Sequence, residues 1–195
     1  SIEKNCIVVM PSAVVRGIYE SSGGNYVSAM ASLVADIRHK TGCSVVIAPH
    51  SYQAGLPEGR MNDGPVCREV AEACSGDSQV LGLDFDLTAG ELRHLVAQSS
   101  VLVTSRFHAM ISGLATSTPT VVVGWSHKYK EVLDDFGLSA LGLDSSALQE
   151  PSAIADIVTN VLASKDEMSQ QISAALPAVK IRSLRNFSAI AEAAR

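Results

Sequence analysis

Short apolar runs recur along the chain without polar alternation, and each run predicts a β-strand that is buried on both faces. Pro49 closes one of these runs, which is where a central strand would have to end. The predicted strands cover residues 6–10, 43–48, 79–83, 101–103 and 120–124, and residues 139–143 are predicted as a sixth short strand.

Apolar residues at helical spacing fill most of the stretches between these runs. Asn25 is placed to cap a helix that Gly42 ends, and Thr88 with Glu91 three residues later has the pattern of a capping box. Further helices are predicted over residues 65–73, 108–115, 129–136, 151–164 and 166–195. We expect the last helix to be kinked or broken at Pro177, because proline removes a helical hydrogen bond.

This alternation of strands and helices predicts a doubly wound α/β fold. Its sheet would be mostly parallel and Rossmann-like, and it would lie between two layers of helices. The chain has no internal repeat, low-complexity segment or linker that would divide it. Residues 1–195 are therefore expected to form one domain.

Ligands of such sheets bind beyond the carboxyl ends of the strands, near the point where the strand order reverses. The segments that follow the predicted strands are residues 11–17, 50–52, 84–86, 104–108 and 124–128. Neither the dinucleotide-binding pattern G-x-G-x-x-G nor the P-loop pattern follows any of these strands. A nicotinamide- or ATP-dependent enzyme of the usual kind is therefore not expected.

The first candidate site is the stretch of residues 104–109, between a buried strand and an apolar helix. The planar guanidinium of Arg106 suits a carboxylate or a phosphate, and the amides that begin the helix would add to an anion site. His108 has an imidazole that can transfer a proton near neutral pH. The alternative is structural: Arg106 pairs with a local carboxylate, and His108 caps the helix.

The second candidate site is the stretch of residues 124–128, which follows the next strand and so lies at the same sheet edge. Lys128 would supply a point charge to an anion, and Ser126 and His127 would hydrogen-bond to a polar ligand. Trp125 would offer a stacking face to a sugar or a ring. The alternative is a solvated lysine beside a tryptophan that packs under a loop.

A third group consists of His50, at the end of a strand, and Asp63 in the polar loop that follows. Asp63 is expected to cap the next helix or to bind a backbone amide. A hydrolase triad of Ser105, His108 and Asp63 is disfavoured, since the chain has no G-x-S-x-G elbow. Asp84 and Asp86 are spaced like metal ligands, but without a third ligand they are interpreted as turn residues, and we expect no metal site.

Composition excludes several classes of protein. Of 195 residues, 15 are Lys or Arg and 20 are Asp or Glu, which gives a net charge of −5 and disfavours non-specific nucleic-acid binding. The 47% of hydrophobic residues excludes disorder, and no apolar run approaches the length of a transmembrane helix. The four cysteines form no C-x-x-C pair, so a zinc site is not expected and a reducing, cytoplasmic setting is predicted. They are Cys6, Cys43, Cys67 and Cys74, of which the first two are expected in the core.

Several of these features together resemble the C-terminal half of the polysaccharide pyruvyl transferase family. They are S-R-F-H-A at residues 105–109, Pro119 before a strand, Lys128, and F-G-L at residues 136–138. His50 and the pair at residues 62–63 also resemble the family pattern, whereas Thr118 stands where the family usually has glycine. The resemblance covers residues 43–140.

The resemblance implies a two-domain, glycosyltransferase-B-like enzyme that transfers a pyruvyl group from phosphoenolpyruvate to a sugar hydroxyl, without a resident cofactor. It implies that Arg106 and His108 hold the donor, that His108 protonates its methylene carbon, and that Lys128 neutralises the departing phosphate. The other implied substrate-binding residues are Ser105, His50, Trp125, Ser126 and His127.

Two expectations concern partners. The chain begins with Ser-Ile rather than Met, and we expect a further N-terminal domain to complete the cleft. Residues 165–195 would pack on that domain, with packing on a second copy of the chain as the alternative, through an exposed apolar strip. The strip consists of Ile172, Leu176, Leu184, Phe187 and Ile190.

Two other functions compete with pyruvyl transfer. A nucleotide-sugar-dependent glycosyltransferase has the same architecture, but it would need a carboxylate for the ribose, and Asp134 and Asp135 lie too far into their helix. The third hypothesis is an anion- or sugar-binding module without catalysis.

Overall fold

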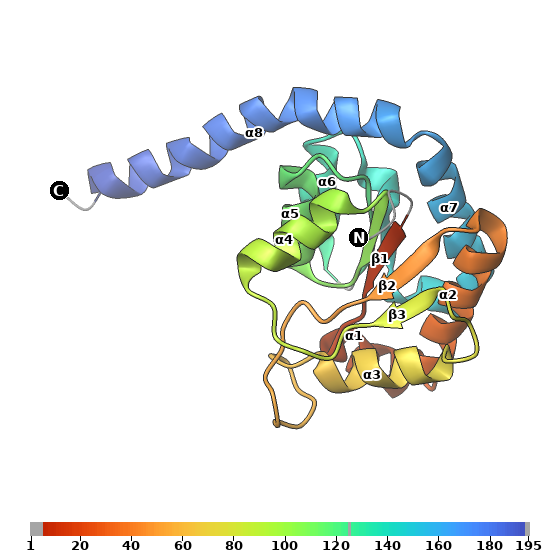
Figure 1. Ribbon diagram of the computed structural model, residues 1–195. Helices are drawn as coiled ribbons and strands as arrows, with labels where there is room; N and C mark the ends of the chain where they lie inside the picture. The colour runs from red at the N-terminus through yellow and green to blue at the C-terminus, as the bar shows by residue number, and fades with distance from the viewer. Residues whose placement is uncertain (1–5, 125, 194–195) are drawn as a thin grey trace.

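A single parallel sheet forms the centre of the molecule. The computed structural model describes residues 6–124 and 126–193, and it describes the side chains of the last helix as far as residue 184. The six described strands all run parallel, in the order β3-β2-β1-β4-β5-β6. They are β1 (Cys6–Met10), β2 (Ser44–Ile47), β3 (Val80–Gly82), β4 (Val101–Thr104), β5 (Thr120–Gly124) and β6 (Gly142–Asp144). With helices on both faces of this sheet (Figure 1), the predicted doubly wound, Rossmann-like fold is confirmed.

The helices follow the predicted order, with boundaries that differ by a few residues. They are α1 (Ala13–Ser21), α2 (Tyr26–Thr41), α3 (Gly64–Ala73), α4 (Ala89–Gln98), α5 (Phe107–Ala115), α6 (His127–Asp134), α7 (Pro151–Ala163) and α8 (Lys165–Ala193). The capping box of α4 is present: the Thr88 hydroxyl accepts from the Glu91 amide at 3.2 Å, and the Glu91 carboxylate accepts from the Thr88 amide at 2.8 Å. Gly42 ends α2 in the left-handed conformation, with φ of 68°.

Three predictions about elements were wrong. Helix α1 was not predicted, because adjacent valines and Gly17 give this short segment a low helix propensity, and burial of Val15 and Tyr19 stabilises it instead. The strand predicted at residues 139–143 begins only at residue 142, after a 3-10 turn. Of the kink or break expected at Pro177, the break is wrong, because α8 continues through this residue. The position is exposed, so the carbonyl that loses its partner can bind water.

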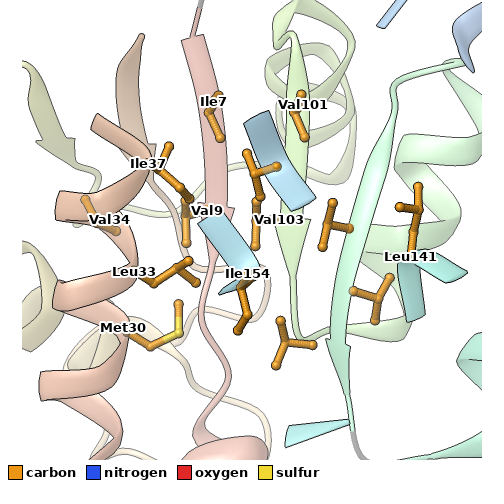
Figure 2. Packing of buried hydrophobic residues seen from close by; sticks show 14 of the residues in the cluster. Ile7, Val9, Met30, Leu33, Val34, Ile37, Val101, Val103, Leu141 and Ile154 are labelled. Carbon is orange, nitrogen blue, oxygen red and sulfur yellow. The ribbon is translucent and has the colours of Figure 1, made fainter. Parts of the chain in front are cut away.

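Alternate side chains of the strands point into two separate apolar layers. Ile7 and Val9 of β1 pack with Leu33 of α2 and Ile154 of α7 on one face, as Figure 2 shows. Their neighbours on β1 pack against α4 and α5 on the other face. That second layer contains Val8, Met10, Val46, Ala48, Leu95, Val96, Leu102 and Ala109. Cys6 and Cys43 are buried as predicted.

Helix α8 crosses the molecule and then extends beyond it (Figure 1). The expected apolar strip on this helix is exposed only in part. Ile172 is fully buried in the core and Leu176 is half-buried, whereas Ile181 and Leu184 are exposed. Phe187 and Ile190 lie outside the described side chains.

Within residues 6–124 and 126–193, no helix combines the length and apolar character that a membrane crossing requires.

The strand order reverses between β1 and β4, which lie side by side at the centre of the sheet. The chain leaves β1 toward β2 and β3 on one side, and it leaves β4 toward β5 and β6 on the other. The loops at the carboxyl ends of β1 and β4 therefore diverge and leave a crevice between them, which is where ligands bind in folds of this class.

Candidate active site

A cavity of about 390 Å³ opens at this reversal of strand order. Its walls come from the start of α1, the segment after β2, the start of α5 and one residue of α6. The lining residues are Ser12, Val14, His50, Ser51, Arg60, Met61, Ser105, Arg106, Phe107, His108 and Tyr129. The structure thus brings His50, Ser105, Arg106 and His108 to one place, although they come from two strand ends far apart in the sequence.

Arg106 is held by protein partners on one edge of its guanidinium. Its Nε donates to Oδ2 of Asp63 at 2.8 Å, its Nη2 donates to Oδ1 of the same carboxylate, and Nη2 also donates to the carbonyl of Arg60 at 2.9 Å. The side chain of Asp63 is fully buried, and that of Arg106 is 16% exposed. Arg106 therefore does pair with a local carboxylate, as the structural alternative proposed, and it also lines the cavity.

Asp63 binds backbone amides rather than capping α3. Its Oδ1 accepts from the Ala13 amide at 2.9 Å, and its Oδ2 accepts from the Ser51 amide at 3.3 Å. Of the two roles expected for this residue, amide binding is confirmed. Asp63 does occupy the N-cap position of α3, but its side chain makes no capping hydrogen bond, because both oxygens are engaged by Ala13, Ser51 and Arg106. One carboxylate thus connects the segments that follow β1, β2 and β4.

Two imidazoles lie next to each other in the cavity. The rings of His50 and His108 are nearly parallel, with 13° between their planes and 6.4 Å between their centroids. Burial lowers the pKa of His50, the Asp63 carboxylate opposes this shift, and Arg106 and His108 lower the pKa further. His50 is therefore held in its neutral form near pH 7, whereas the more exposed His108 faces solvent and any bound ligand.

Helix α5 begins at the cavity with its first amides available. Arg106 is the N-cap residue, and in the described part of the chain no side chain accepts a capping hydrogen bond from this helix. The Arg106 amide itself donates to Oγ1 of Thr104 at 3.0 Å. The uncapped amides and the positive end of the helix dipole lie beside the two histidines, a setting that favours negative charge.

Ser105 links neighbouring segments through its backbone. Its amide donates to the Met10 carbonyl at 3.1 Å, and its carbonyl accepts from the Tyr129 hydroxyl at 3.3 Å. These bonds join the end of β4 to the end of β1 and to α6. The Ser105 side chain is itself nearly buried, with the residue 3% exposed.

The second candidate segment lies beside this cavity rather than within it. Ser126 caps α6, and its hydroxyl accepts from the Lys128 amide at 3.4 Å. Ser126 and His127 line a separate depression of about 150 Å³ between β5 and β6, which Tyr129 connects to the main cavity. The Lys128 side chain is exposed and lines neither space. Trp125 lies outside the described residues.

Two polar residues of the cavity wall, Ser12 and Tyr129, were not singled out from the sequence. Ser12 follows β1 directly, at a strand end where function was expected, but it belongs to no motif. Its amide donates at 3.1 Å to the hydroxyl of Tyr26, which is fully buried, and this burial raises the pKa of Tyr26. Tyr129 reaches the cavity from α6, and no local pattern marks it.

Across the described residues, no cluster of three or more His, Cys, Asp or Glu side chains is arranged to hold a metal.

Comparison with known proteins identifies the same stretch of chain. The family model for polysaccharide pyruvyl transferase matches residues 81–127, from β3 to the start of α6. The resemblance to polysaccharide pyruvyl transferases is confirmed. The matched stretch includes Ser105, Arg106 and His108 from the main cavity and Ser126 and His127 from the depression beside it.

A curated protein is similar to about half of the chain. The chain is 31% identical over 91 residues to the amylovoran biosynthesis protein AmsJ of Erwinia amylovora. The similar region covers 47% of this chain and 22% of AmsJ. The chain thus matches only about a fifth of the length of this relative.

Proposed function

We propose that the chain is the donor-binding part of a polysaccharide pyruvyl transferase, which moves a pyruvyl group from phosphoenolpyruvate to sugar hydroxyls. The observation that carries this proposal is the convergence of Arg106, His108 and His50 on one cavity. It lies at the reversal of strand order, and Arg106 and His108 fall within the stretch that matches the family model.

The electrostatics of the cavity suit a donor that carries both a carboxylate and a phosphate. Arg106 is a fixed cation, Arg60 is a second one at the rim, and the uncapped start of α5 adds oriented amides. Asp63 neutralises part of the Arg106 charge, so the helix amides and Arg60 carry a larger share of the anion binding than the sequence motif indicates. We expect no resident cofactor, because the donor brings the reactive group with it.

In the proposed reaction His108, in its protonated form, gives a proton to the methylene carbon of phosphoenolpyruvate. The carbon that bears the phosphate then becomes oxocarbenium-like and is attacked by one sugar hydroxyl, whose proton restores His108. Loss of phosphate regenerates an electrophilic carbon, and a second hydroxyl closes the ketal while its proton leaves with the phosphate. His50, held neutral, is suited to take the proton of the second hydroxyl and pass it to the departing phosphate.

The acceptor side of the cleft is proposed to come from a second, N-terminal domain in a glycosyltransferase-B-like arrangement. The cavity is bounded on one side by this chain, and Lys128 lies exposed beside it, where a partner domain or a bound phosphate would meet it. The exposed Ile181 and Leu184 of α8 offer a further contact surface. The four free cysteines agree with a cytoplasmic protein.

The proposal is tested by phosphate release from phosphoenolpyruvate in the presence of sugar acceptors, with the full-length protein. We expect His108→Ala to lower turnover by about 10²–10⁴-fold, the usual contribution of a general acid. His94→Ala is the matched control, since His94 is exposed on α4 and outside the cavity, and it should leave turnover unchanged.

Three results would contradict the proposal. Turnover that survives His108→Ala would remove the assigned acid. A nucleotide sugar that raises the melting temperature of the chain more than phosphoenolpyruvate does would favour a glycosyltransferase. Binding of phosphoenolpyruvate without turnover in the full-length protein would favour a non-catalytic module.

A further inference from the structure

Asp63 lies beside the cavity but takes no part in the steps of the proposed reaction. Its buried carboxylate accepts hydrogen bonds from the Ala13 amide, the Ser51 amide and the Arg106 guanidinium. Each partner begins or follows a different strand end, so this single side chain joins three of the four segments around the cavity. A buried negative charge beside a site for an anionic donor would, by charge alone, weaken binding of that donor.

We propose that Asp63 is a positioning residue for Arg106. The hydrogen bonds in the described part of the chain use Nε and Nη2 of Arg106, two toward Asp63 and one toward the Arg60 carbonyl. Nη1 is the group left for a ligand. The guanidinium is therefore fixed through Nε and Nη2, so an anion that enters the cavity binds to a cation that is already in position. This inference rests on the proposed function in that the anion is taken to be phosphoenolpyruvate.

The shape of the loop does not explain why Asp63 is an aspartate. The neighbouring Asn62 holds that loop: its Nδ2 donates to the Leu56 carbonyl at 2.8 Å and to the Pro57 carbonyl at 3.1 Å. Its Oδ1 accepts from the Gln53 amide at 3.1 Å. Asp63 accepts one hydrogen bond from this loop, from the Ser51 amide, and its bonds to the Arg106 guanidinium have no counterpart at Asn62. Most of the side-chain bonds that shape the loop thus belong to Asn62 and those that hold the guanidinium belong to Asp63, so the two roles can be compared by mutation.

The decisive variant is Asp63→Asn, because a role of Asp63 through its charge and a role in positioning Arg106 predict opposite changes in the affinity for phosphoenolpyruvate. Removal of a carboxylate should tighten anion binding if Asp63 acts through its charge alone. If Asp63 positions Arg106, phosphoenolpyruvate should bind about tenfold more weakly, since a misplaced binding group loses much of its effect. Affinity is measured by titration calorimetry on the chain, at a temperature where circular dichroism shows the variant folded. Asp84→Asn is the matched control, because Asp84 forms an equally bidentate pair with Arg68 on the surface.

Ala13→Pro is a second variant that should fold even if Asp63→Asn does not. Ala13 is the first residue of α1, where proline is well tolerated, and Ser12 has the extended backbone that precedes proline, with φ of −136° and ψ of 127°. The substitution removes the amide that binds Asp63, and the proline Cδ, which stands where the amide hydrogen was, pushes the Asp63 carboxylate away from α1. We expect a roughly threefold loss of phosphoenolpyruvate affinity, in keeping with one lost hydrogen bond.

A measurement without ligand separates this inference from the proposed function. In the wild-type chain, the Nε–H of Arg106 should exchange slowly with water in NMR spectra, and the Nε–H of Arg68 should exchange fast. Asp63→Asn should make the Arg106 signal exchange fast as well. Equal exchange of the two arginines in the wild type, or unchanged or tighter anion binding by Asp63→Asn, would overturn the positioning role. Slow exchange at Arg106 together with no phosphoenolpyruvate binding would instead overturn the proposed function and leave Asp63 as the group that fixes Arg106.

Discussion

Two aspartate–arginine pairs in this molecule have nearly the same geometry and different surroundings. Arg68 donates from Nε and Nη2 to the two oxygens of Asp84, each at 2.9 Å, and Arg106 uses the same two nitrogens toward Asp63. The Arg68 and Asp84 side chains are 49% and 48% exposed. Those of Arg106 and Asp63 are 16% and 0% exposed. The sequence pattern favours a turn residue at Asp84 and does not predict its partner, Arg68, which lies 16 positions earlier in the chain.

The comparison shows that surroundings, rather than hydrogen-bond geometry, decide what such a pair does. Water screens the exposed pair, so it adds little to stability. The buried pair is costly to assemble and costly to break, because a lone charge would remain in the interior. A core of apolar residues would serve stability as well, so the charges at the cavity agree with the proposed role in ligand binding.

The largest expected difference between the pairs is in stability. Asp63→Ala leaves the Arg106 guanidinium and two backbone amides without their partner, and we expect it to lower the free energy of unfolding by about 3–5 kcal/mol. Asp84→Ala should cause no change that urea unfolding can resolve. If the two variants lose stability equally, burial does not distinguish the pairs.

A smaller loss of stability is expected when the positive charge of Arg106 is kept but its planar guanidinium is lost. Arg106→Lys cannot reach Asp63 and the Arg60 carbonyl together, and we expect it to cost about 1.5–3 kcal/mol in the same unfolding experiment. Arg68→Lys should behave like the wild type, because its exposed partner is hydrated with either cation. Equal stability of Arg106→Lys and the wild type would show that charge alone is sufficient at the buried pair.

The smallest expected effect is a difference between His50 and Asp84 in how their contributions to stability depend on pH. Burial, chiefly, holds the pKa of His50 below its ordinary value of 6.5. The stability that neutral His50 allows is therefore complete above pH 6.5 and is lost as the pH falls through the pKa of the folded state. The pKa of Asp84 is held below its ordinary value of 3.8 by Arg68, so its contribution is lost only in stronger acid.

Thermal melts between about pH 7.5 and about pH 5 test this difference. The wild type should lose more stability over that range than His50→Gln, while the difference between the wild type and Asp84→Asn should stay constant. Parallel pH profiles for the wild type and His50→Gln would show that His50 is not held neutral by the fold.

Most of the sheet could be predicted from local sequence. Strands such as β1 and β4 are short apolar runs because both of their faces are covered, and this pattern is visible without any knowledge of contacts. The capping box at Thr88 and the glycine that ends α2 are likewise local signals. Once the alternation of elements was known, the sheet edge that carries the cavity followed from topology.

The rest depends on contacts between distant residues. Asp63 and Arg106 are 43 positions apart, and neither motif states that one holds the other. Helix α1 is stabilised by burial against the core rather than by its own propensity, and α8 continues through Pro177 because solvent replaces the missing partner. Lys128 looks adjacent to the first motif along the sheet edge, yet its side chain lies outside the cavity.

The amide of Asn62 has a consequence for how fast a ligand can enter. Since Asn62 is nearly buried and binds backbone groups on both sides of the loop, the rim that carries Arg60 and Met61 is already shaped in the empty protein. A loop that needs no closure adds no conformational step before encounter, and its ordering entropy has been spent during folding. Arrival of a small anion at this rim should then be limited by diffusion and electrostatic attraction rather than by motion of the loop.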